Sequence, residues 1–252
     1  MSQGRIALVT GGSRGIGRAI AEALAKAGLS VVLSYREREE EAQAVVAHIK
    51  GTGGQASALR ADVGEPGQAR ALARAVIDAH GRIDVLVNNA GVHLPGAKLA
   101  DTPAQEWERI LRVNLSGPFH LIQAVLPGMR ERRTGHIVNL SSNVTSRMPA
   151  GYGAYTVSKS GLEALTRILS KEEGPNGIRV NAVAPGPIRT DMLRESLEVM
   201  GPERADAFVR SVPLGRTGEP REIAAAVAFL VSDAAGYITG QVLYVNGGGP
   251  GG

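Results

Sequence analysis

The chain has 252 residues, of which 43% are hydrophobic and 21% charged, and this balance excludes low-complexity disorder. It contains no cysteine, so a disulfide framework, a thiolate nucleophile and a Cys-ligated metal centre are excluded. The formal net charge of +4 admits a nucleic acid as a partner, but the basic residues are dispersed, and the 4% of aromatic residues are too few for base stacking. We therefore expect no nucleic-acid partner.

The histidines and the N-terminal residues indicate neither a metal site nor a membrane anchor. The five histidines (48, 80, 93, 120 and 136) never form the His-Glu-x-x-His spacing of a zinc site. The first residues, MSQGRIALVTGG, lack a signal-peptide pattern, and no apolar run reaches 18 residues. We expect a cytoplasmic protein that does not contact a membrane.

Short apolar runs alternate with amphipathic segments along the chain. The runs that predict strands lie at 5–10, 30–35, 55–62, 83–89, 136–142, 178–185 and 241–247. The segments that predict helices lie at 15–28, 37–50, 66–80, 103–131, 154–173, 202–210 and 219–232. Nearly continuous Val, Ile and Leu is typical of strands buried on both faces of a parallel sheet. The predicted fold is α/β, a Rossmann-like doubly wound parallel sheet of seven strands flanked by helices. We expect a single domain over residues 1–246 and a Gly-rich end over 247–252.

The 33 glycines are roughly twice the usual share, and several fall in the turn between the first strand and the first helix. A tight turn there needs Gly11, close approach of the backbone to a pyrophosphate needs Gly15, and packing of the helix on the sheet needs Gly17. The N-terminus of the helix offers unpaired N–H groups to the phosphates. The residues predicted to bind the dinucleotide in this turn are Gly11, Gly12, Ser13, Arg14, Gly15, Ile16 and Gly17.

The end of the second strand predicts which dinucleotide is bound. An NAD enzyme places Asp or Glu there to bind the ribose 2′-hydroxyl, whereas this chain has Tyr35-Arg36. Arg36 and Arg14 can pair with a 2′-phosphate through charge-assisted hydrogen bonds. We expect NADP(H) to be preferred, and NAD(H) stays possible because Glu37 comes next.

The ends of the third and fourth strands carry further candidates for the cofactor site. Asp62-Val63 follows the third strand, and its carboxylate either caps the next helix or accepts a hydrogen bond from the adenine amine. Asn88 and Asn89 are poor strand formers at a strand end, which predicts side chains that brace the backbone. Ala90 and Gly91 are then expected to lie close to the cofactor.

A serine, a tyrosine and a lysine form the candidate catalytic group. Ser142 ends the fifth strand, at the edge where doubly wound sheets bind ligands. Tyr155 and Lys159 are four residues apart, so they share one face of a helix, whereas the rival Tyr152 has Thr156 at that spacing. A neighbouring ammonium favours the phenolate, so we expect it to lower the pKa of Tyr155 from its usual ~10. These residue types suit proton transfer to or from an oxygen that changes its charge.

At this point the chain resembles a classical short-chain dehydrogenase/reductase over nearly its whole length. The matching motifs are TGGSRGIG, the DV after the third strand, NNAG, NLSG from Asn114, Ser142, Tyr155-x-x-x-Lys159 and the segment Pro185-Gly186-x-Ile188-x-Thr190. The resemblance implies that Tyr155 is the general acid/base and that Ser142 hydrogen-bonds the substrate oxygen. It implies that Lys159 lowers the pKa of Tyr155 and binds the nicotinamide ribose, and that Asn114 holds a water in a proton relay. It also places Pro185, Gly186, Ile188 and Thr190 at the nicotinamide end.

Within the family the chain most resembles the 3-oxoacyl-acyl-carrier-protein reductases. Such enzymes carry an Arg where Arg133 stands and a second basic residue where this chain has Asn176, so the match to their carrier site is partial. Arg130, Arg132 and Arg133 are equally explained as a basic helix end that complements the helix dipole. The alternative substrate is a free sugar, cyclic alcohol or polyketide-type ketone. A catalytically silent dinucleotide-binding regulator is the remote alternative, and it predicts losses among the four catalytic residues, all of which are present.

Other residues are expected to shape the substrate side. The segment 192–212, which carries Met192, Met200 and Phe208, is predicted to form a mobile lid. His93, Asn143 and Arg147 flank the predicted cleft, and Trp107 is expected to pack into a core or an interface. By resemblance, the helices predicted at 103–131 and 154–173 form a contact between subunits of a homotetramer.

Overall fold

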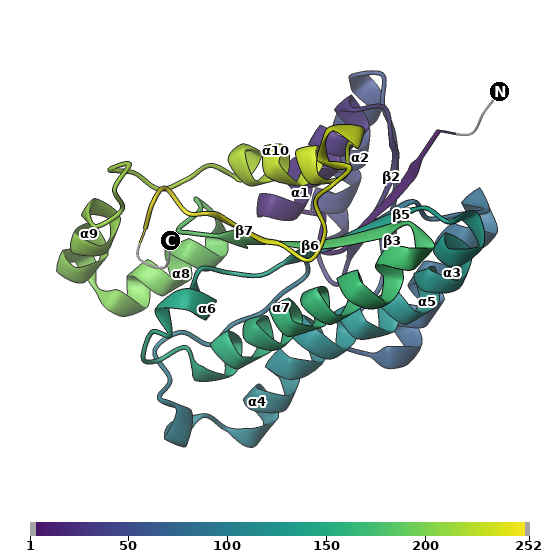
Figure 1. Ribbon diagram of the computed structural model, residues 1–252. Helices are drawn as coiled ribbons and strands as arrows, with labels where there is room; N and C mark the ends of the chain where they lie inside the picture. Colours follow the sequence, from purple (N-terminus) through teal and green to yellow (C-terminus); the bar gives the residue numbers. More distant parts are fainter. Residues whose placement is uncertain (1–3, 250–252) are drawn as a thin grey trace.

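One parallel sheet forms the centre of the protein, which we describe from a computed structural model over residues 4–249. Its seven strands run in the order β3-β2-β1-β4-β5-β6-β7 (Figure 1). They are β1 (Ile6–Val9), β2 (Ser30–Tyr35), β3 (Gln55–Arg60), β4 (Val85–Asn88), β5 (Gly135–Leu140), β6 (Ile178–Pro185) and β7 (Val242–Val245). All six neighbouring pairs are parallel, which confirms the predicted doubly wound fold.

Helices cover both faces of the sheet, as right-handed crossovers between parallel strands require. On one face lie α1 (Gly15–Lys26), α2 (Glu39–Gly51) and α10 (Pro220–Leu230), and on the other lie α3 (Pro66–His80), α4 (Ala104–Leu111), α5 (Gly117–Arg132) and α7 (Gly153–Glu173). The remaining helices, α6 (Val144–Arg147), α8 (Asp191–Met200) and α9 (Pro202–Arg210), gather beyond one end of the sheet (Figure 1).

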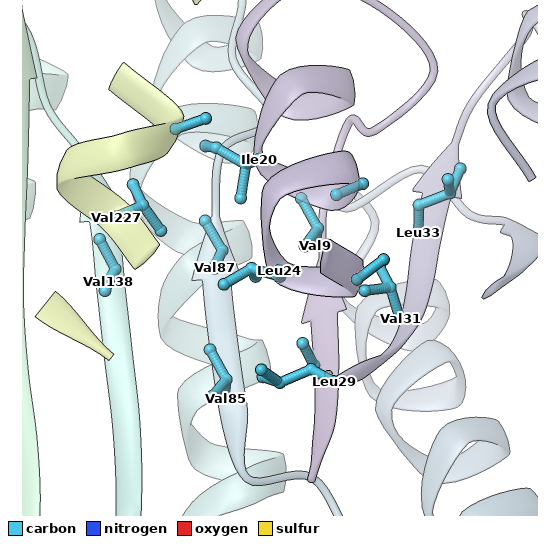
Figure 2. Packing of buried hydrophobic residues seen from close by; sticks show 14 of the residues in the cluster. Val9, Ile20, Leu24, Leu29, Val31, Leu33, Val85, Val87, Val138 and Val227 are labelled. Atoms are coloured by element: carbon cyan, nitrogen blue, oxygen red, sulfur yellow. The ribbon is translucent and has the colours of Figure 1, made fainter. Parts of the chain in front are cut away.

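The strands β1, β2, β4, β5 and β6 are largely buried and divide their side chains between two hydrophobic cores, whereas the edge strands β3 and β7 are partly exposed. In β1, Ala7 and Val9 belong to the core under α1 and α10, while Ile6 and Leu8 belong to the core under α3 and α5. Figure 2 shows the first core, where Ile20 and Leu24 of α1 project onto Val9 and Val87. Burying such a side chain contributes about 1.5–3 kcal/mol to stability, so these contacts fix the position of α1 on the sheet.

The strand order creates the crevice that holds the site. From β1 the chain moves outward through β2 and β3, then crosses back to β4 on the other side of β1. In sheets of this kind, ligands bind beyond the carboxyl ends of the strands at the point where the order reverses. The loops that follow β1, β4 and β5 therefore meet at one edge.

The predicted helix at 103–131 is interrupted in the structure. A π-helical turn, Arg112–Ser116, separates α4 from α5, and Trp107 is partly buried on α4. Pro118 has no N–H to donate to the carbonyl of Asn114 four residues earlier, so regular α-helical bonding fails there. The π turn leaves the Asn114 side chain fully buried.

The predicted lid and the predicted Gly-rich end have defined local structure. The lid segment contains two helices, α8 and α9, although the sequence predicted only the second. At the C-terminal end, the Leu214 N–H donates to the Gly247 carbonyl at 3.1 Å, and the Gly248 N–H donates to Asn246 Oδ1 at 3.1 Å. Residues 250–252 of that end lie outside the described residues, and the boundary at residue 247 stays a prediction.

Candidate active site

A cleft of about 1060 Å³ opens at the carboxyl edge of the sheet, between β1, β4, β5 and the segment after β6. Nearly all of the residues predicted to bind the cofactor or to catalyse line it, from Gly11 in the first turn to Thr190 before α8. The two exceptions are Gly12 and Asn114. A Cβ on Gly12 would lie 2.6 Å from Leu33 Cβ, so this glycine serves the packing of the turn on β2 rather than the cleft.

The turn after β1 is shaped by glycines that leave no room for side chains. Gly11 and Gly15 have positive φ angles of 65° and 55°. A Cβ on Gly17 would lie 2.2 Å from the carbonyl oxygen of Gly11, so α1 packs directly on the turn. No side chain caps the N-terminus of α1, and no acidic residue occurs in its first turn. Its free N–H groups and the positive end of its dipole therefore face the cleft and suit a phosphate.

Asn89 braces this turn from the end of β4, as predicted. Its side-chain amide donates to the carbonyls of Thr10 (2.8 Å) and Gly11 (3.1 Å). In return, Thr10 Oγ1 accepts from the backbone N–H groups of Asn89 (3.0 Å) and Ala90 (3.1 Å). These hydrogen bonds hold the loop after β1 against the loop after β4, at the point where the strand order reverses.

Three charged side chains beside the ends of β1, β2 and β3 form ion pairs: Arg14, Arg36 and Asp62. Arg36 contacts Glu37 at 2.7 Å and Asp62 at 3.9 Å, and Arg14 forms an ion pair with Asp191 at the start of α8. Each arginine is about half exposed, at 47%. The Arg14 guanidinium holds the pKa of the Asp191 carboxyl below its usual value. Water screens these pairs, so each contributes little to stability and can be exchanged for a phosphate partner.

The structure excludes one of the two roles weighed for Asp62, that of a helix cap, and leaves the hydrogen bond to the adenine amine as a prediction. Asp62 Oδ1 accepts from the backbone N–H of Gly64 at 2.9 Å, while α3 starts only after Glu65. Asp62 therefore shapes the turn after β3 and does not cap the helix. Asp62 still lines the cleft, as does Tyr35, although Tyr35 is 94% buried and belongs to the hydrophobic core.

Ser142, Tyr155 and Lys159 line the inner part of the cleft together. The Lys159 Nζ lies 5.7 Å from the centre of the Tyr155 ring and donates a hydrogen bond to the Leu140 carbonyl at 2.6 Å. Tyr155 and Lys159 are 8% and 3% exposed, so little water reaches either group.

Burial controls how these two groups titrate. It raises the pKa of the Tyr155 phenol to about 12, although a hydrogen bond from Ser142 acts in the opposite direction. Burial also lowers the pKa of the Lys159 ammonium to about 8. The pKa of Tyr155 thus shifts opposite to the expected direction, because the loss of hydration is the largest cause of the shift.

The Asn114 side chain is hydrogen-bonded to neighbouring segments of the protein. Its amide donates to the Val92 carbonyl at 2.9 Å and to Ser158 Oγ at 3.0 Å, while its Oδ1 accepts from the Val92 N–H at 2.9 Å. A Cβ added to Gly91 would lie 3.5 Å from both Asn114 Oδ1 and Lys159 Nζ. Gly91 therefore leaves an open cradle between the π turn and the lysine.

The segment after β6 closes the other side of the cleft. The Gly186 N–H donates to the Val245 carbonyl at 3.0 Å, and a Cβ there would lie 2.6 Å from Asn246 Cα. Thr190 caps α8, since its Oγ1 accepts from the Leu193 N–H at 3.3 Å. A Cβ on Gly15 would be 3.4 Å from Thr190 Cγ2, so this segment reaches across to the glycine turn.

Six residues that line the cleft come from the segments after β4, β5 and β6, and we call this group the substrate end: His93, Ser142, Arg147, Tyr152, Met200 and Phe208. The His93 ring lies 6.2 Å from the Tyr155 ring, and its Nε2 is 3.2 Å from Ser196 Oγ on α8. Burial lowers the pKa of His93, so the ring is neutral near pH 7. The Arg147 guanidinium stacks 5.1 Å from the centre of the Phe208 ring on α9.

Several residues that line the cleft belong to none of the motifs in the sequence. Arg38, Ser196, Glu219 and Arg221 are among them. Glu219 and Arg221 reach the cleft because Ile188 forms a bridge with Gly218, a contact between distant segments that has no local signal in the sequence.

The residues present fit a dinucleotide. The glycine turn gives phosphates access to the free N–H groups of α1, and the cradle at Gly91 borders Lys159. Over residues 4–249, no group of three His, Asp or Glu side chains comes together in a way that could hold a metal ion. Over the same residues, no helix is long and apolar enough to cross a membrane.

The arginine cluster at the end of α5 lies away from the cleft. Arg130 pairs with the buried Glu173, and Arg133 donates to the Pro175 carbonyl at 2.7 Å. Asn176 donates to Glu173 Oε2 at 3.0 Å. Because Arg133 precedes β5 and Ser142 follows it, the six-residue strand separates the two by about 20 Å. Within one chain, Arg133 thus lies at the opposite edge of the sheet from the site.

Known proteins resemble this chain over nearly its full length. A family model described as enoyl-(acyl carrier protein) reductase matches residues 11–249. The 3-oxoacyl-[acyl-carrier-protein] reductase FabG of Staphylococcus aureus is 42% identical over 248 residues, which covers 98% of this chain and 99% of that protein.

Solved structures share the fold. A blue fluorescent protein from a metagenomic library, solved in complex with NADPH, is 38% identical, with a TM-score of 0.89 and 98% of each chain covered. Levodione reductase is 36% identical, with a TM-score of 0.92 over 97% of this chain and 96% of that one.

Proposed function

The chain belongs to the short-chain dehydrogenase/reductase family of NAD(P)-dependent oxidoreductases, and we propose that it interconverts a carbonyl and a secondary alcohol with Tyr155 as general acid/base. The observation that carries this proposal is the convergence of Ser142, Tyr155 and Lys159 in one cleft with the glycine turn. These residues combine an oxygen-binding hydroxyl, a proton donor and a cation, as reduction of a carbonyl requires.

Each residue has a defined task in this proposal. The nicotinamide cofactor, when bound, supplies or accepts the hydride. Ser142 and Tyr155 hydrogen-bond the substrate oxygen, and the Tyr155 phenol gives up its proton as that oxygen gains negative charge. A phenol with a pKa of about 12 holds its proton at neutral pH, so the resting protein is ready to reduce a carbonyl. Oxidation of the alcohol needs the phenolate, which the charge of Lys159 would stabilise.

Lys159 and Asn114 are proposed to return the proton to Tyr155. Lys159 titrates near pH 8, so it can exchange protons close to neutrality. The side-chain amide of Asn114 is hydrogen-bonded to Val92 and Ser158. We therefore propose that the backbone carbonyl of Asn114, which cannot accept a hydrogen bond from Pro118, accepts one from a relay water.

We propose that NADP(H) is the preferred cofactor. The support comes from Arg14 and Arg36, two half-exposed guanidinium groups beside the ends of β1 and β2 that a 2′-phosphate can engage. Glu37 opposes this preference, since it holds Arg36 at 2.7 Å. Changing Arg36→Ala should lower the kcat/KM ratio of NADPH to NADH by about tenfold. An unchanged ratio would refute the assignment.

We propose that the substrate is a 3-oxoacyl thioester, the class that the reductase of Staphylococcus aureus is named for. The alternative, a free ketone, sugar or cyclic alcohol, gains support from the arginine cluster. Arg133 is about 20 Å from Ser142 along β5, and Asn176 replaces the second basic residue of a carrier site.

A substrate panel separates these candidates. NADPH oxidation is followed with acetoacetyl thioesters, crotonyl thioesters, free ketones and sugars. Activity on the acetoacetyl thioester alone supports the proposal, whereas activity only on free ketones or sugars selects the alternative. Turnover of crotonyl thioester alone would show reduction of a C=C bond, the reaction in the description of the matching family model, and would contradict both.

The homotetramer and the cytoplasmic location remain proposals. Phe119 on α5 and Val157 and Ile168 on α7 are 40%, 46% and 53% exposed, an apolar surface that a subunit contact would cover. Size-exclusion chromatography with light scattering tests this, and a species with the 26.2 kDa mass of one chain would contradict it.

A further inference from the structure

The substrate end of the cleft differs from the rest in its charge. Five carboxylates line the whole cleft, from Glu22, Glu37, Asp62, Asp191 and Glu219. Each forms an ion pair with an arginine, and none belongs to the substrate end. The carboxylates that line the cleft are therefore neutralised by arginines, and Glu195 on α8, whose charge acts on His93, does not line the cleft.

Arg147 supplies a positive charge at that end. Its guanidinium lies on the face of the Phe208 ring, and no ion pair or side-chain hydrogen bond joins it to another residue in the range 4–249. Stacking on an aromatic face leaves the N–H groups at the edge of the guanidinium plane free to donate. A guanidinium with free N–H groups can form a two-pronged hydrogen bond to a carboxylate or phosphate.

The neighbouring polar groups do not compete for such an anion. His93 is neutral near pH 7 because burial lowers its pKa, and its Nε2 is engaged with Ser196. The other cation of the inner cleft, Lys159, is 97% buried and donates to the Leu140 carbonyl. Arg221 also lines the cleft without an ion pair over residues 4–249, but it stands on α10, which packs against α1. Within the substrate end, Arg147 is therefore the free guanidinium for an anionic group of a substrate whose carbonyl lies at Ser142 and Tyr155.

We propose that Arg147 binds an anionic group of the substrate, either a carboxylate or a phosphate, and so selects acidic carbonyl compounds over neutral ones. The inference rests on the proposed function, since it takes the substrate oxygen to lie at Ser142 and Tyr155. In this proposal Arg147 on α6 determines which substrates bind, while the catalytic residues stay the same. The stacking on Phe208 also connects α9 to the bound anion, so that the lid helix contacts the same residue as the substrate.

A binding measurement tests this without turnover. Titration calorimetry compares 3-hydroxybutyrate with 1,3-butanediol, which has the same carbon skeleton without the carboxylate. Arg147→Gln should weaken binding of 3-hydroxybutyrate about tenfold or more and leave the diol unchanged. Arg210→Gln is the matched control, because it removes one positive charge from an exposed position on α9 that does not line the cleft. Equal affinity of the wild type for the acid and the diol would overturn the proposal for a carboxylate.

Turnover then identifies which anion is bound. The substrates are acetoacetate, acetoacetyl-coenzyme A and the neutral N-acetylcysteamine thioester of acetoacetate. Arg147→Gln should lower kcat/KM about tenfold for at least one charged substrate, with the neutral thioester within twofold. A loss only with acetoacetate assigns a carboxylate, and a loss only with the coenzyme A thioester assigns a phosphate. Equal losses on charged and neutral substrates, or none, overturn the proposal.

The outcomes distinguish this proposal from the proposed function. A wild type that binds 3-hydroxybutyrate through Arg147 but reduces no carbonyl contradicts the proposed function and retains the anion site. A wild type that reduces the neutral thioester, with all three substrates unaffected by Arg147→Gln, retains the proposed function and removes the anion site. Arg147→Lys keeps the charge without the planar stack and should recover part of the lost affinity.

Discussion

The two ends of the cleft are built in different ways. At the end beside β1 and β2, backbone groups form the surface, glycines provide the space, and every lining carboxylate is paired with an arginine. At the substrate end, side chains from four separate segments form the surface, with Met200 and Phe208 carried by helices that follow β6. The first end is therefore set by the local sequence, whereas the second depends on which distant segments meet.

This contrast explains how far the sequence could predict the molecule. The strands and the glycine turn follow from local rules, since Gly11 and Gly15 adopt positive φ and Gly17 lies against the Gly11 carbonyl. The pairing of Arg14 with Asp191 joins residues 177 positions apart, and the contact of His93 with Ser196 spans 103 positions. No spacing rule predicts such contacts, because they depend on how the segment after β6 folds over the cleft.

The titration of Tyr155 shows the same limit. Its four-residue spacing to Lys159 correctly predicted that both side chains reach the cleft. The direction of its pKa shift could not be predicted, because burial and the hydrogen bond from Lys159 to Leu140 are tertiary features. Similarly, the hydrophobic pattern did not predict the π turn at Asn114. That turn follows from a single residue, Pro118, which has no N–H for the helical hydrogen bond.

The largest effect is expected at the catalytic group. Tyr155→Phe removes the proton donor and should lower kcat about 10³-fold, while NADPH binding, measured by fluorescence titration, stays within a few-fold. Tyr152→Phe is the matched control, because Tyr152 lines the cleft without a lysine four residues later, and it should lose less than tenfold. Comparable losses in both variants would contradict the assignment of Tyr155.

The next effect concerns the end of the cleft built from backbone. Gly17→Ala places a Cβ 2.2 Å from the Gly11 carbonyl, so α1 must move away from the turn. Overpacking of this kind costs about 1–3 kcal/mol of unfolding free energy, and NADPH binding should weaken with it. Urea unfolding and NADPH titration measure the two effects.

Gly67→Ala on α3 provides the control for that substitution. An added Cβ there meets no atom within 4 Å, so alanine should stabilise the protein by up to about 1 kcal/mol through helix propensity. If Gly17→Ala behaved like Gly67→Ala, the turn would not have the close packing described here.

The buried lysine predicts a pH dependence of stability. The pKa of Lys159 is about 8 in the folded protein and has the ordinary value of 10.5 in the unfolded chain, so between these values the unfolded state binds more protons. Lys159 should therefore raise the free energy of unfolding by on the order of 2 kcal/mol as the pH increases from 8 to 9.5. Lys159→Met should lack this contribution, as urea unfolding at both pH values would show. The same slope in the wild type and the variant would contradict it.

The smallest effect is expected for Glu163, whose carboxylate is hydrogen-bonded to residues on both sides of Ser142. Glu163 on α7 is 5% exposed, and its Oε1 accepts from Ser141 Oγ and Thr145 Oγ1, both at 2.7 Å. Glu163→Gln keeps the shape and weakens these charge-assisted bonds, which should cost about 1 kcal/mol of unfolding free energy and raise the KM of the carbonyl substrate. Glu172→Gln, at an exposed position of the same helix, should change neither quantity. Identical results for the two variants would show that the network does not position Ser142.

Transfer of deuterium from NADPH labelled at C4 of the nicotinamide tests the central claim most directly. The labelled cofactor is supplied with acetoacetyl and crotonyl thioesters together, and the deuterium content of each product is measured by mass spectrometry. We expect a 3-hydroxybutyryl thioester that carries one deuterium on the carbinol carbon, and formation of this product about 10³-fold more slowly by Tyr155→Phe at equal enzyme concentration. Deuterium found only in a butyryl thioester, or the same labelled alcohol formed at the wild-type rate by Tyr155→Phe, would contradict it.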